Sequence, residues 1–241
     1  MKTLNQYIKE KLIINKDYND SSISPKSFDE LRKIIIYRYD KLGPGTKQNP
    51  IDFNDIDVSN IDSFCNDKDT GIFDGMDFKY IDISDWDVSN VTNMRCMFFD
   101  CGELKSVGDL SNWDVSNVTN MVGMFYECNE LKFIGDISSW NVSKVTNMAH
   151  MFNYCKKFNQ DISKWKVSSV TDMNHMFYKC ESFNQDISGW DVSSVKDMSF
   201  MFDFCDSFNQ DISKWNVSKV SDKAGMFHCC PIKNEYKPKF K

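Results

Sequence analysis

Apolar residues recur along most of the chain at a nearly fixed spacing. Six tryptophans lie 27, 27, 25, 25 and 25 residues apart: Trp86, Trp113, Trp140, Trp165, Trp190 and Trp215. The segments between them follow the pattern W-x-V-S-x-V-T-x-M-x-x-M-F-x-x-C-x-x-F-N-Q-D-I-S-x. A period of about 20 to 50 residues predicts structural repeats that stack, because a single unit cannot bury its apolar face alone.

One unit predicts the elements of a coil. The stretches "QDI" and "WxVSxVT" alternate apolar and polar residues, which favours short strands. In "TDMNHMFYKC" the apolar residues have helical spacing, and they are Met173, Met176, Phe177 and Cys180. The sequence therefore predicts an α+β repeat in which each coil runs strand, bend, short strand and short helix. We expect the strands of successive coils to stack in parallel.

The ends of the repeat region differ from its middle. A weaker unit opens it at Ile56, and the closing unit has Lys223 where the others have methionine. The first two full units carry a two-residue insertion, in "LKSVGDLSNW" and "LKFIGDISSW", which belongs at a bend between faces. We expect six to seven coils of 25–27 residues in a repeat domain over residues 51–230, followed by a polar tail over 231–241.

Residues 1–50 predict a separate helical region. The stretch "SFDELRKIIIYRYDKLGPG" has a capping box at Ser27 and Glu30, and its helix should stop at Gly43. An earlier helix is expected over Leu4–Ile13. This region either caps the first coil or docks the chain on a larger assembly, with Met1–Lys16 as the docking part.

The quoted repeat resembles a known type. The motif "WDVSNVTNM…MF…C…F…DIS" is similar to the repeat of BspA-like leucine-rich repeat surface proteins over about residues 50 to 230. The resemblance implies a right-handed leucine-rich-repeat-like solenoid and, from surface-exposed relatives, a role in adhesion or host contact. The leader, with "NQYIKEKLIIN" and "NDIDVSNI", resembles leaders of such repeats in gut Bacteroidetes and their phages.

Charge and hydropathy exclude some classes of function. The net charge of −6 argues against a broad nucleic-acid-binding face. No apolar run reaches the roughly 18 residues of a membrane span, so we expect no membrane insertion. Since no signal-peptide, lipobox or wall-anchor pattern is seen, we expect a cytoplasmic or virion-associated protein, with the cell surface added by the family resemblance.

Three columns of polar or reactive residues recur at fixed slots. The cysteine column is Cys101, Cys128, Cys155, Cys180, Cys205 and Cys230, and we expect buried thiols, with a disulfide ladder as the alternative. The aspartate column is Asp82, Asp109, Asp136, Asp161, Asp186 and Asp211. We expect it to accept hydrogen bonds from backbone N–H groups or from the serine two residues on, and the alternative is a cation-binding stripe. His150 and His175 share a slot, where we expect surface residues in preference to a metal pair.

The variable positions of the repeat are the candidate partner-binding surface. They are Gln160, Lys164, Lys166, Gln185, Asp191, Gln210, Lys214 and Asn216. We expect a non-enzymatic repeat protein, without catalytic residue, cofactor or metal, that recognises a protein or glycan partner in an adhesion-type interaction. The alternative is a structural or decoration component of a phage virion docked through the N-terminal helices. The tryptophan column should be core and not a stacking platform.

Overall fold

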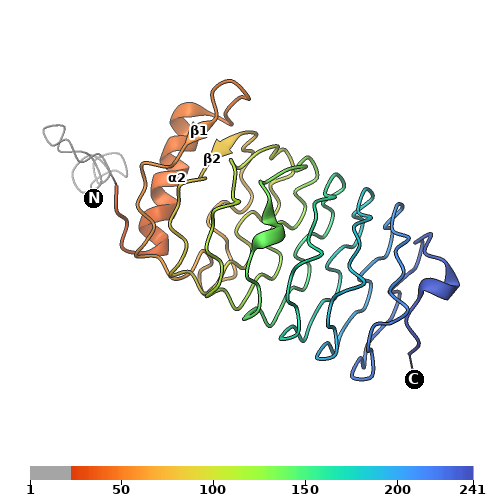
Figure 1. Ribbon diagram of the computed structural model, residues 1–241. Helices are drawn as coiled ribbons and strands as arrows, with labels where there is room; N and C mark the ends of the chain where they lie inside the picture. Colours follow the sequence, from red (N-terminus) through yellow and green to blue (C-terminus); the bar gives the residue numbers. More distant parts are fainter. Residues whose placement is uncertain (1–22, 241) are drawn as a thin grey trace, which may run out of the picture.

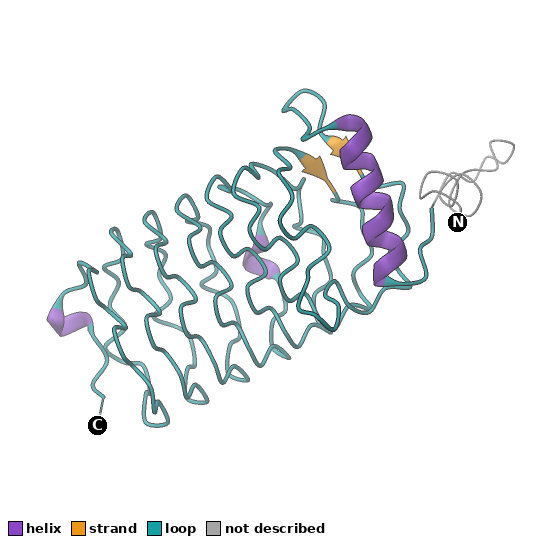
Figure 2. Ribbon diagram, turned by 180° about the vertical axis from the view of Figure 1, so that it is seen from behind, coloured by secondary structure: helices purple, strands orange, loops and turns teal. Residues whose placement is uncertain are grey.

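The computed structural model describes residues 23–240, and in them the chain forms an elongated stack of coils with one α-helix at the N-terminal end (Figure 1). The regular elements of this part are α2 (Phe28–Leu42), β1 (Ile51–Asp52), β2 (Ile81–Asp82) and the short 3-10 helices η2 (Ile137–Ser139) and η3 (Asn234–Tyr236). Figures 1 and 2, drawn from opposite sides, show the coils lying side by side from α2 to the C-terminal end.

Neighbouring coils are joined in parallel register. β1 pairs with β2, and Ile51 lies opposite Ile81. A row of isolated parallel bridges then continues along the stack through Ser63, Asn93, Asn120, Asn147, Asp172, Asp197 and Asp222. The sequence period is therefore the step from one coil to the next. The finer assignment, to a right-handed leucine-rich-repeat-like solenoid, stays a prediction.

The Met-Phe segment of each coil is not a helix, so the helix predicted for "TDMNHMFYKC" is wrong. His175 and Lys179 have φ values of 53° and 56°, whereas an α-helix needs a φ near about −60°. The segment is instead a run of β-turns. The N–H of Met176, for example, donates to the carbonyl of Met173 at 3.2 Å. A β-turn brings its first and fourth residues together, so it produces the same i, i+3 apolar spacing as a helix.

Alternate backbone N–H groups of this segment bond to the next coil. At donor–acceptor distances of 2.9–3.0 Å, Met173, His175, Phe177 and Lys179 donate to the carbonyls of Asp197, Ser199, Met201 and Asp203 respectively. The same two slots have positive φ in every coil of this type. They are Cys96 and Asp100, Gly123 and Glu127, His150 and Tyr154, His175 and Lys179, Phe200 and Phe204, and Gly225 and Cys229. Positive φ is uncommon outside glycine, so the fold imposes it here.

Turns also replace most of the strands predicted at "QDI" and "WxVSxVT". Only β1 and β2, in the first coils, form strands in the described part of the chain. In the coil that begins at Ile162, the N–H of Trp165 donates to the Ile162 carbonyl at 3.1 Å, and Val170 donates to Val167 at 2.9 Å. The Asp and Ser residues at these bends bond to the local backbone and so favour turns over strands.

The inward ends of the turns form one apolar core. Each of the nine fixed apolar side chains between Ile162 and Phe183 is at most 2% exposed. The six tryptophans are 2–5% exposed, which confirms that they belong to the core. Their indole N–H groups donate to carbonyls of the preceding coil, as Trp190 does to Ile162 at 3.1 Å. Phenylalanine rings stack from coil to coil, as Phe177 does on Phe202 with ring centroids 5.7 Å apart.

Helix α2 covers the first coil. The Ser27 hydroxyl caps it by accepting from the Glu30 N–H, as the sequence predicts, and the Glu30 carboxylate accepts from the Lys26 N–H at 2.8 Å. The helix ends at Gly43, whose φ is 73°. Its buried side chains are Leu31, Ile34 and Ile35, and they join the core cluster of the stack. These contacts place the helix against the core of the first coil, and Leu4–Ile13 lies outside the described residues.

The segment predicted as a polar tail packs on the last coils. Ile232 is only 4% exposed, and Pro238 is buried. The N–H of Ile212 donates to the Tyr236 carbonyl in η3 at 3.0 Å. Residues 231–240 therefore cover part of the end of the stack.

The indole bonds lead to a first prediction. Trp190→Phe removes the donor to the Ile162 carbonyl and leaves a small void, so the free energy of unfolding should fall by about 1–3 kcal/mol. Urea denaturation followed by circular dichroism measures the change. Lys214→Ala, at an exposed position in the next coil, should leave the midpoint nearly unchanged. Equal midpoints for wild type and Trp190→Phe would contradict the role given to the indole.

The aspartate column closes the bend before each tryptophan. The N–H of the serine two residues on donates to the carboxylate in all six coils, at 2.8–3.0 Å, and this confirms the predicted hydrogen bonding. The Ser163 hydroxyl and then its N–H lower the pKa of Asp161 below its ordinary value. The Ser188 hydroxyl and N–H lower the pKa of Asp186 in the same way.

These lowered pKa values predict acid sensitivity. The carboxylates contribute stability above their unfolded-state pKa near about 4, and that contribution is lost as the pH falls through the folded-state pKa. Melting temperature should therefore be flat from about pH 7 to pH 5 and fall below about pH 4. Replacing both Asp161 and Asp186 with Asn should flatten the fall and lower stability at neutral pH. Asp206→Asn, an exposed site outside these bends, should do neither.

Candidate functional site

Two successive coils are longer than the others, because each carries a two-residue insertion. They contain the inserted residues of "LKSVGD" and "LKFIGD", at 104–109 and 131–136. Gly108 has a φ of 87° and passes so close to Asp82 that a Cβ would collide with its carboxylate. The insertion therefore needs glycine at this point. Lys105 and Lys132 occupy the same slot in the two insertions, and both side chains are exposed.

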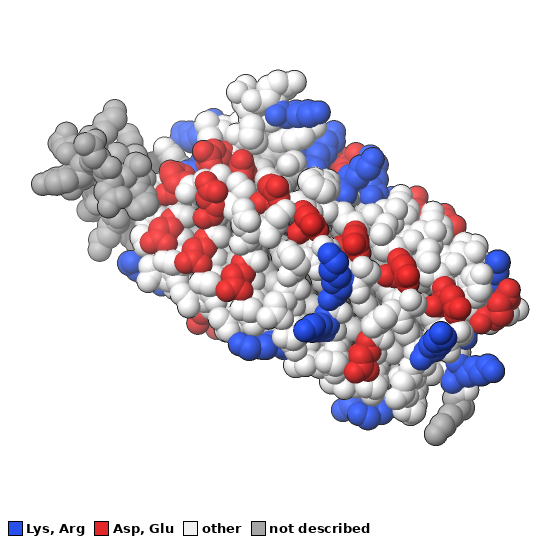
Figure 3. Space-filling view, viewed as in Figure 1, with Lys and Arg blue, Asp and Glu red and all other residues white. Residues whose placement is uncertain are grey.

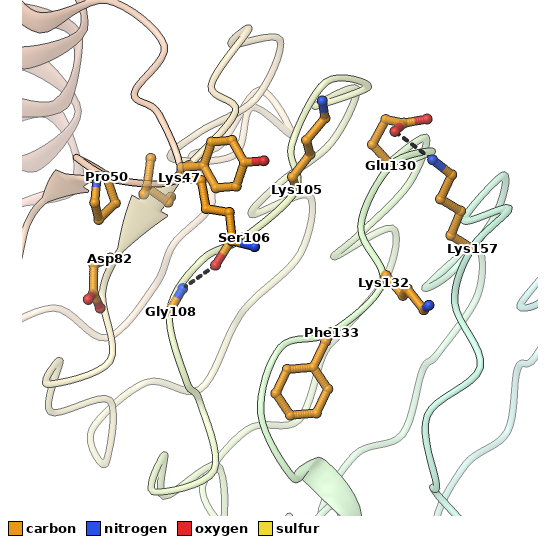
Figure 4. Close-up of a pocket in the computed structure, with 12 residues that line it drawn as sticks. Lys47, Pro50, Asp82, Lys105, Ser106, Gly108, Glu130, Lys132, Phe133 and Lys157 are labelled. Atoms are coloured by element: carbon orange, nitrogen blue, oxygen red, sulfur yellow. Dashed lines mark hydrogen bonds and ion pairs between the residues drawn. The ribbon is translucent and has the colours of Figure 1, made fainter.

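A hollow of about 700 Å³ lies beside these two coils, and residues of both insertions line it. Its lining comes from the loop before β1, from β2 and from three successive coils. It includes Lys47, Pro50, Tyr80, Ile81, Asp82, Lys105, Ser106, Gly108, Glu130, Lys132, Phe133 and Lys157. Figure 4 shows Glu130, Lys132 and Phe133 on one loop, with Lys105 and Lys157 reaching out from the loops on either side. The hollow is therefore an open site in which charged side chains, mostly lysines, lie beside apolar groups that include the Phe133 ring.

The charge of the hollow is opposite to that of the whole chain. Lys157 pairs with Glu130 at 2.6 Å, and the hydrogen bond from Lys157 lowers the pKa of Glu130. Within residues 23–240, no carboxylate lies in ion-pair distance of Lys47, Lys105 or Lys132. In Figure 3, Lys and Arg side chains gather along the upper edge of the molecule, whereas acidic side chains follow a row along the coils. The hollow thus favours an anionic group.

Phe133 adds an apolar contact to this cationic site. Its side chain is 61% exposed, and Leu42 at 63% is the other large exposed apolar residue among residues 23–240. An exposed ring beside cationic groups is typical of a recognition surface. Sequence analysis placed the insertion at a bend but missed the hollow. The lysine and phenylalanine within "LKFIGD" are the signal that could have indicated it.

The predicted partner-binding surface divides into two groups. The three glutamines tie neighbouring coils together through their side-chain amides. Gln185 and Gln210 donate to the backbone and side-chain oxygens of Asn159 and Asn184, and Gln160 donates to the Gly135 carbonyl. Their amides therefore have a structural use that sequence analysis did not foresee.

The other five predicted residues are exposed: Lys164, Lys166, Asp191, Lys214 and Asn216. They flank the tryptophans of three successive coils. Asp191 and Asn216 each accept the N–H of the serine two residues on, at 3.0 and 3.2 Å. These five side chains present variable chemistry on a constant frame, and they lie outside the lining of the hollow.

The cysteine column is buried as predicted, apart from its last member. Cys101, Cys128, Cys155, Cys180 and Cys205 are 0–1% exposed, and Cys230 is partly exposed. Each of the five buried thiols donates to a phenylalanine carbonyl of the preceding coil, as Cys180 does to Phe152 at 2.8 Å. Burial raises the pKa of Cys101 to about 12, so the thiol form dominates there. All nine cysteines are free thiols in the described part of the chain.

His150 and His175 stack on one another and are half-buried, not fully on the surface. Their ring centroids are 4.7 Å apart, and His175 also stacks on Phe200 at 4.9 Å. Desolvation lowers the pKa of both rings, which favours the neutral form. The pair therefore serves as part of an aromatic column on this face. Among residues 23–240, no group of three or more His, Cys, Asp or Glu side chains is arranged so that it could hold a metal ion.

Comparison with known proteins gives a family for this chain. Among residues 23–240, no helix is long and apolar enough to cross a membrane. No curated protein and no solved structure matches the sequence. The model of one family, described as "Mycoplasma protein of unknown function, DUF285", matches residues 45–134 and again residues 129–239. Because these two matches span most of the chain, the protein belongs to the DUF285 family of unknown function.

Proposed function

We propose that the protein is a non-enzymatic repeat protein that presents its stacked surface for recognition of a protein or glycan partner. The repeat divides into constant positions and variable positions, and the location of the two kinds supports this function. Constant positions such as Trp165 and Phe177 are buried, whereas variable positions such as Lys164 and Lys166 face solvent. Substitutions can therefore change the surface without changing the frame. The resemblance of the repeat to BspA-like surface proteins adds the adhesion-type role.

The lysine-lined hollow carries the proposal further, because it indicates the chemistry of the partner. Lys105 and Lys132 have no carboxylate partner within residues 23–240, and Phe133 stands beside them. An acidic group could pair with the lysines while an apolar part covers the ring. We therefore expect an acidic protein segment or an acidic glycan, bound in a salt-dependent manner.

The alternative role, as a phage virion component docked through the N-terminal helices, is less well supported. Helix α2 uses Leu31, Ile34 and Ile35 to cover the first coil, so its apolar stripe is not free to dock elsewhere. The docking segment expected at Met1–Lys16 lies outside the described residues. The hollow, by contrast, offers exposed lysines, Lys105 and Lys132, that have no carboxylate within ion-pair distance in the described part of the chain.

Charge reversal in the hollow tests this function. Binding to an array of acidic and neutral oligosaccharides and peptides should favour the acidic probes at low salt. Combining Lys105→Glu with Lys132→Glu should weaken that binding by about tenfold or more, since about 1.4 kcal/mol is tenfold in affinity. Phe133→Ala should weaken it by a smaller factor.

A matched control separates the hollow from overall charge. Lys196→Glu combined with Lys219→Glu makes the same charge change at exposed sites outside both the hollow and the predicted partner-binding residues, and it should leave the affinity within about twofold. Equal binding of acidic and neutral probes, or equal losses in the two double variants, would refute the assignment of the hollow.

A further inference from the structure

Three reactive side chains meet at the C-terminal end of the stack. The His228 Nδ1 lies 2.8 Å from the Asp203 Oδ1, and its Nε2 lies 3.6 Å from the Cys229 Sγ. Asp203 is buried at 4% exposure, the His228 side chain is 62% exposed, and Cys229 is exposed. The buried Asp203 carboxylate thus contacts the His228 imidazole, and the imidazole in turn contacts the solvent-exposed Cys229 thiol.

The coil-to-coil register creates this arrangement. Asp203 and His228 occupy the same slot in consecutive coils, 25 residues apart. The N–H of Phe204 donates to the His228 carbonyl at 3.0 Å, which holds the imidazole over the carboxylate. Cys229 follows in a slot that has positive φ in every coil of this type, so its φ of 52° comes from the fold. Earlier coils have other side chains at these slots, and only this end combines the three groups.

The chemistry of the three groups is directional. An ionised carboxylate can only accept hydrogen bonds, so Asp203 favours the tautomer of His228 that carries its proton on Nδ1. The lone pair of Nε2 then faces the thiol of Cys229. An imidazole in this position can take the thiol proton, and the thiolate is the form of cysteine that acts as a nucleophile.

Cys229 differs from the other eight cysteines of the chain. Seven are buried: Cys65, Cys96, Cys101, Cys128, Cys155, Cys180 and Cys205. Cys230 is half-buried with its sulfur 3.5 Å from the Phe208 carbonyl, and burial raises its pKa. Of these nine cysteines, Cys229 alone is exposed to solvent, and it lies beside an imidazole.

We propose that Cys229 is a reactive thiol that exchanges with disulfides, with His228 as its base and Asp203 as the residue that positions His228. The Cys229 thiolate attacks one sulfur of a disulfide, a new S–S bond forms, and the old S–S bond breaks. The leaving thiolate takes up the proton that His228 removed. The product is a mixed disulfide that links the end of the stack to a small thiol or to a partner protein. This inference is independent of the hollow.

Labelling kinetics test the proposal on the full chain. Under native conditions, iodoacetamide should modify one thiol, found by mass spectrometry at Cys229, roughly five- to tenfold faster than it modifies free glutathione at neutral pH. Glutathione disulfide should add one glutathionyl group at the same residue. Cys229→Ser should abolish both reactions, and Cys230→Ser should leave both rates unchanged. Native labelling at the rate of free glutathione, or first at another cysteine, would overturn the proposal.

Two variants separate activation from exposure. His228→Gln, at an exposed side chain that the fold can replace, should slow labelling to about the rate of free glutathione. Asp203→Asn should slow it as well, and the ¹⁵N NMR signals of the His228 ring should show the proton moving from Nδ1 toward Nε2. Circular dichroism checks that each variant is folded. If His228→Gln leaves the labelling rate unchanged, His228 is not the base. If Asp203→Asn leaves the tautomer of His228 unchanged, Asp203 does not position it.

Discussion

The coil-to-coil hydrogen-bond ladder is the constraint on which the rest of the structure depends. The interior of the stack is apolar and excludes water, so each inward-facing backbone group must find a partner within the protein. In the Met-Phe segment, alternate N–H groups from Met173 to Lys179 donate to the next coil, and the N–H groups of Met176 and Tyr178 between them close β-turns. This alternation is geometrically feasible because His175 and Lys179 have positive φ values, in the left-handed region. Because the N–H groups of one coil donate to carbonyls of the next, successive coils must have the same backbone geometry, and the sequence therefore repeats.

The same constraint explains where functional chemistry is located. Inside the stack, the tryptophan indoles and the cysteine thiols complete the bonding of carbonyls in the preceding coil, as Trp190 and Cys180 do. These positions cannot vary without loss of packing. The two candidate sites occur where the repeat departs from its regular form. The hollow lies at the two coils widened by an insertion, and the reactive thiol lies in the last coil, at slots where regular coils carry other residues.

Part of this structure follows from the sequence, and the rest shows where apolar spacing is ambiguous. The period, the buried tryptophans and the Ser27 cap of α2 are predictable because each depends on local spacing or local bonding. The helix expected in the Met-Phe segment is wrong, since β-turns and helices share the i, i+3 spacing, and only the positive φ of residues such as His175 separates them. The hollow and the Asp203–His228 contact were missed because both depend on which residues of different coils become neighbours. The glutamines illustrate the same point, since the Gln185 amide donates to the preceding coil, and that contact also depends on which residues become neighbours.

The central claim is that one coil, held by this ladder, is the unit of the structure. Thermal unfolding of two deletion variants, followed by circular dichroism, tests it most directly. Removing residues 183–207 deletes 25 residues and places Phe208 in the slot of Phe183, so every remaining ladder can re-form. The account predicts a folded protein with cooperative unfolding at a moderately lower temperature. Removing only residues 183–194 shifts the slots and should abolish folding of the coils that follow. Equal loss of structure in both variants would contradict the account.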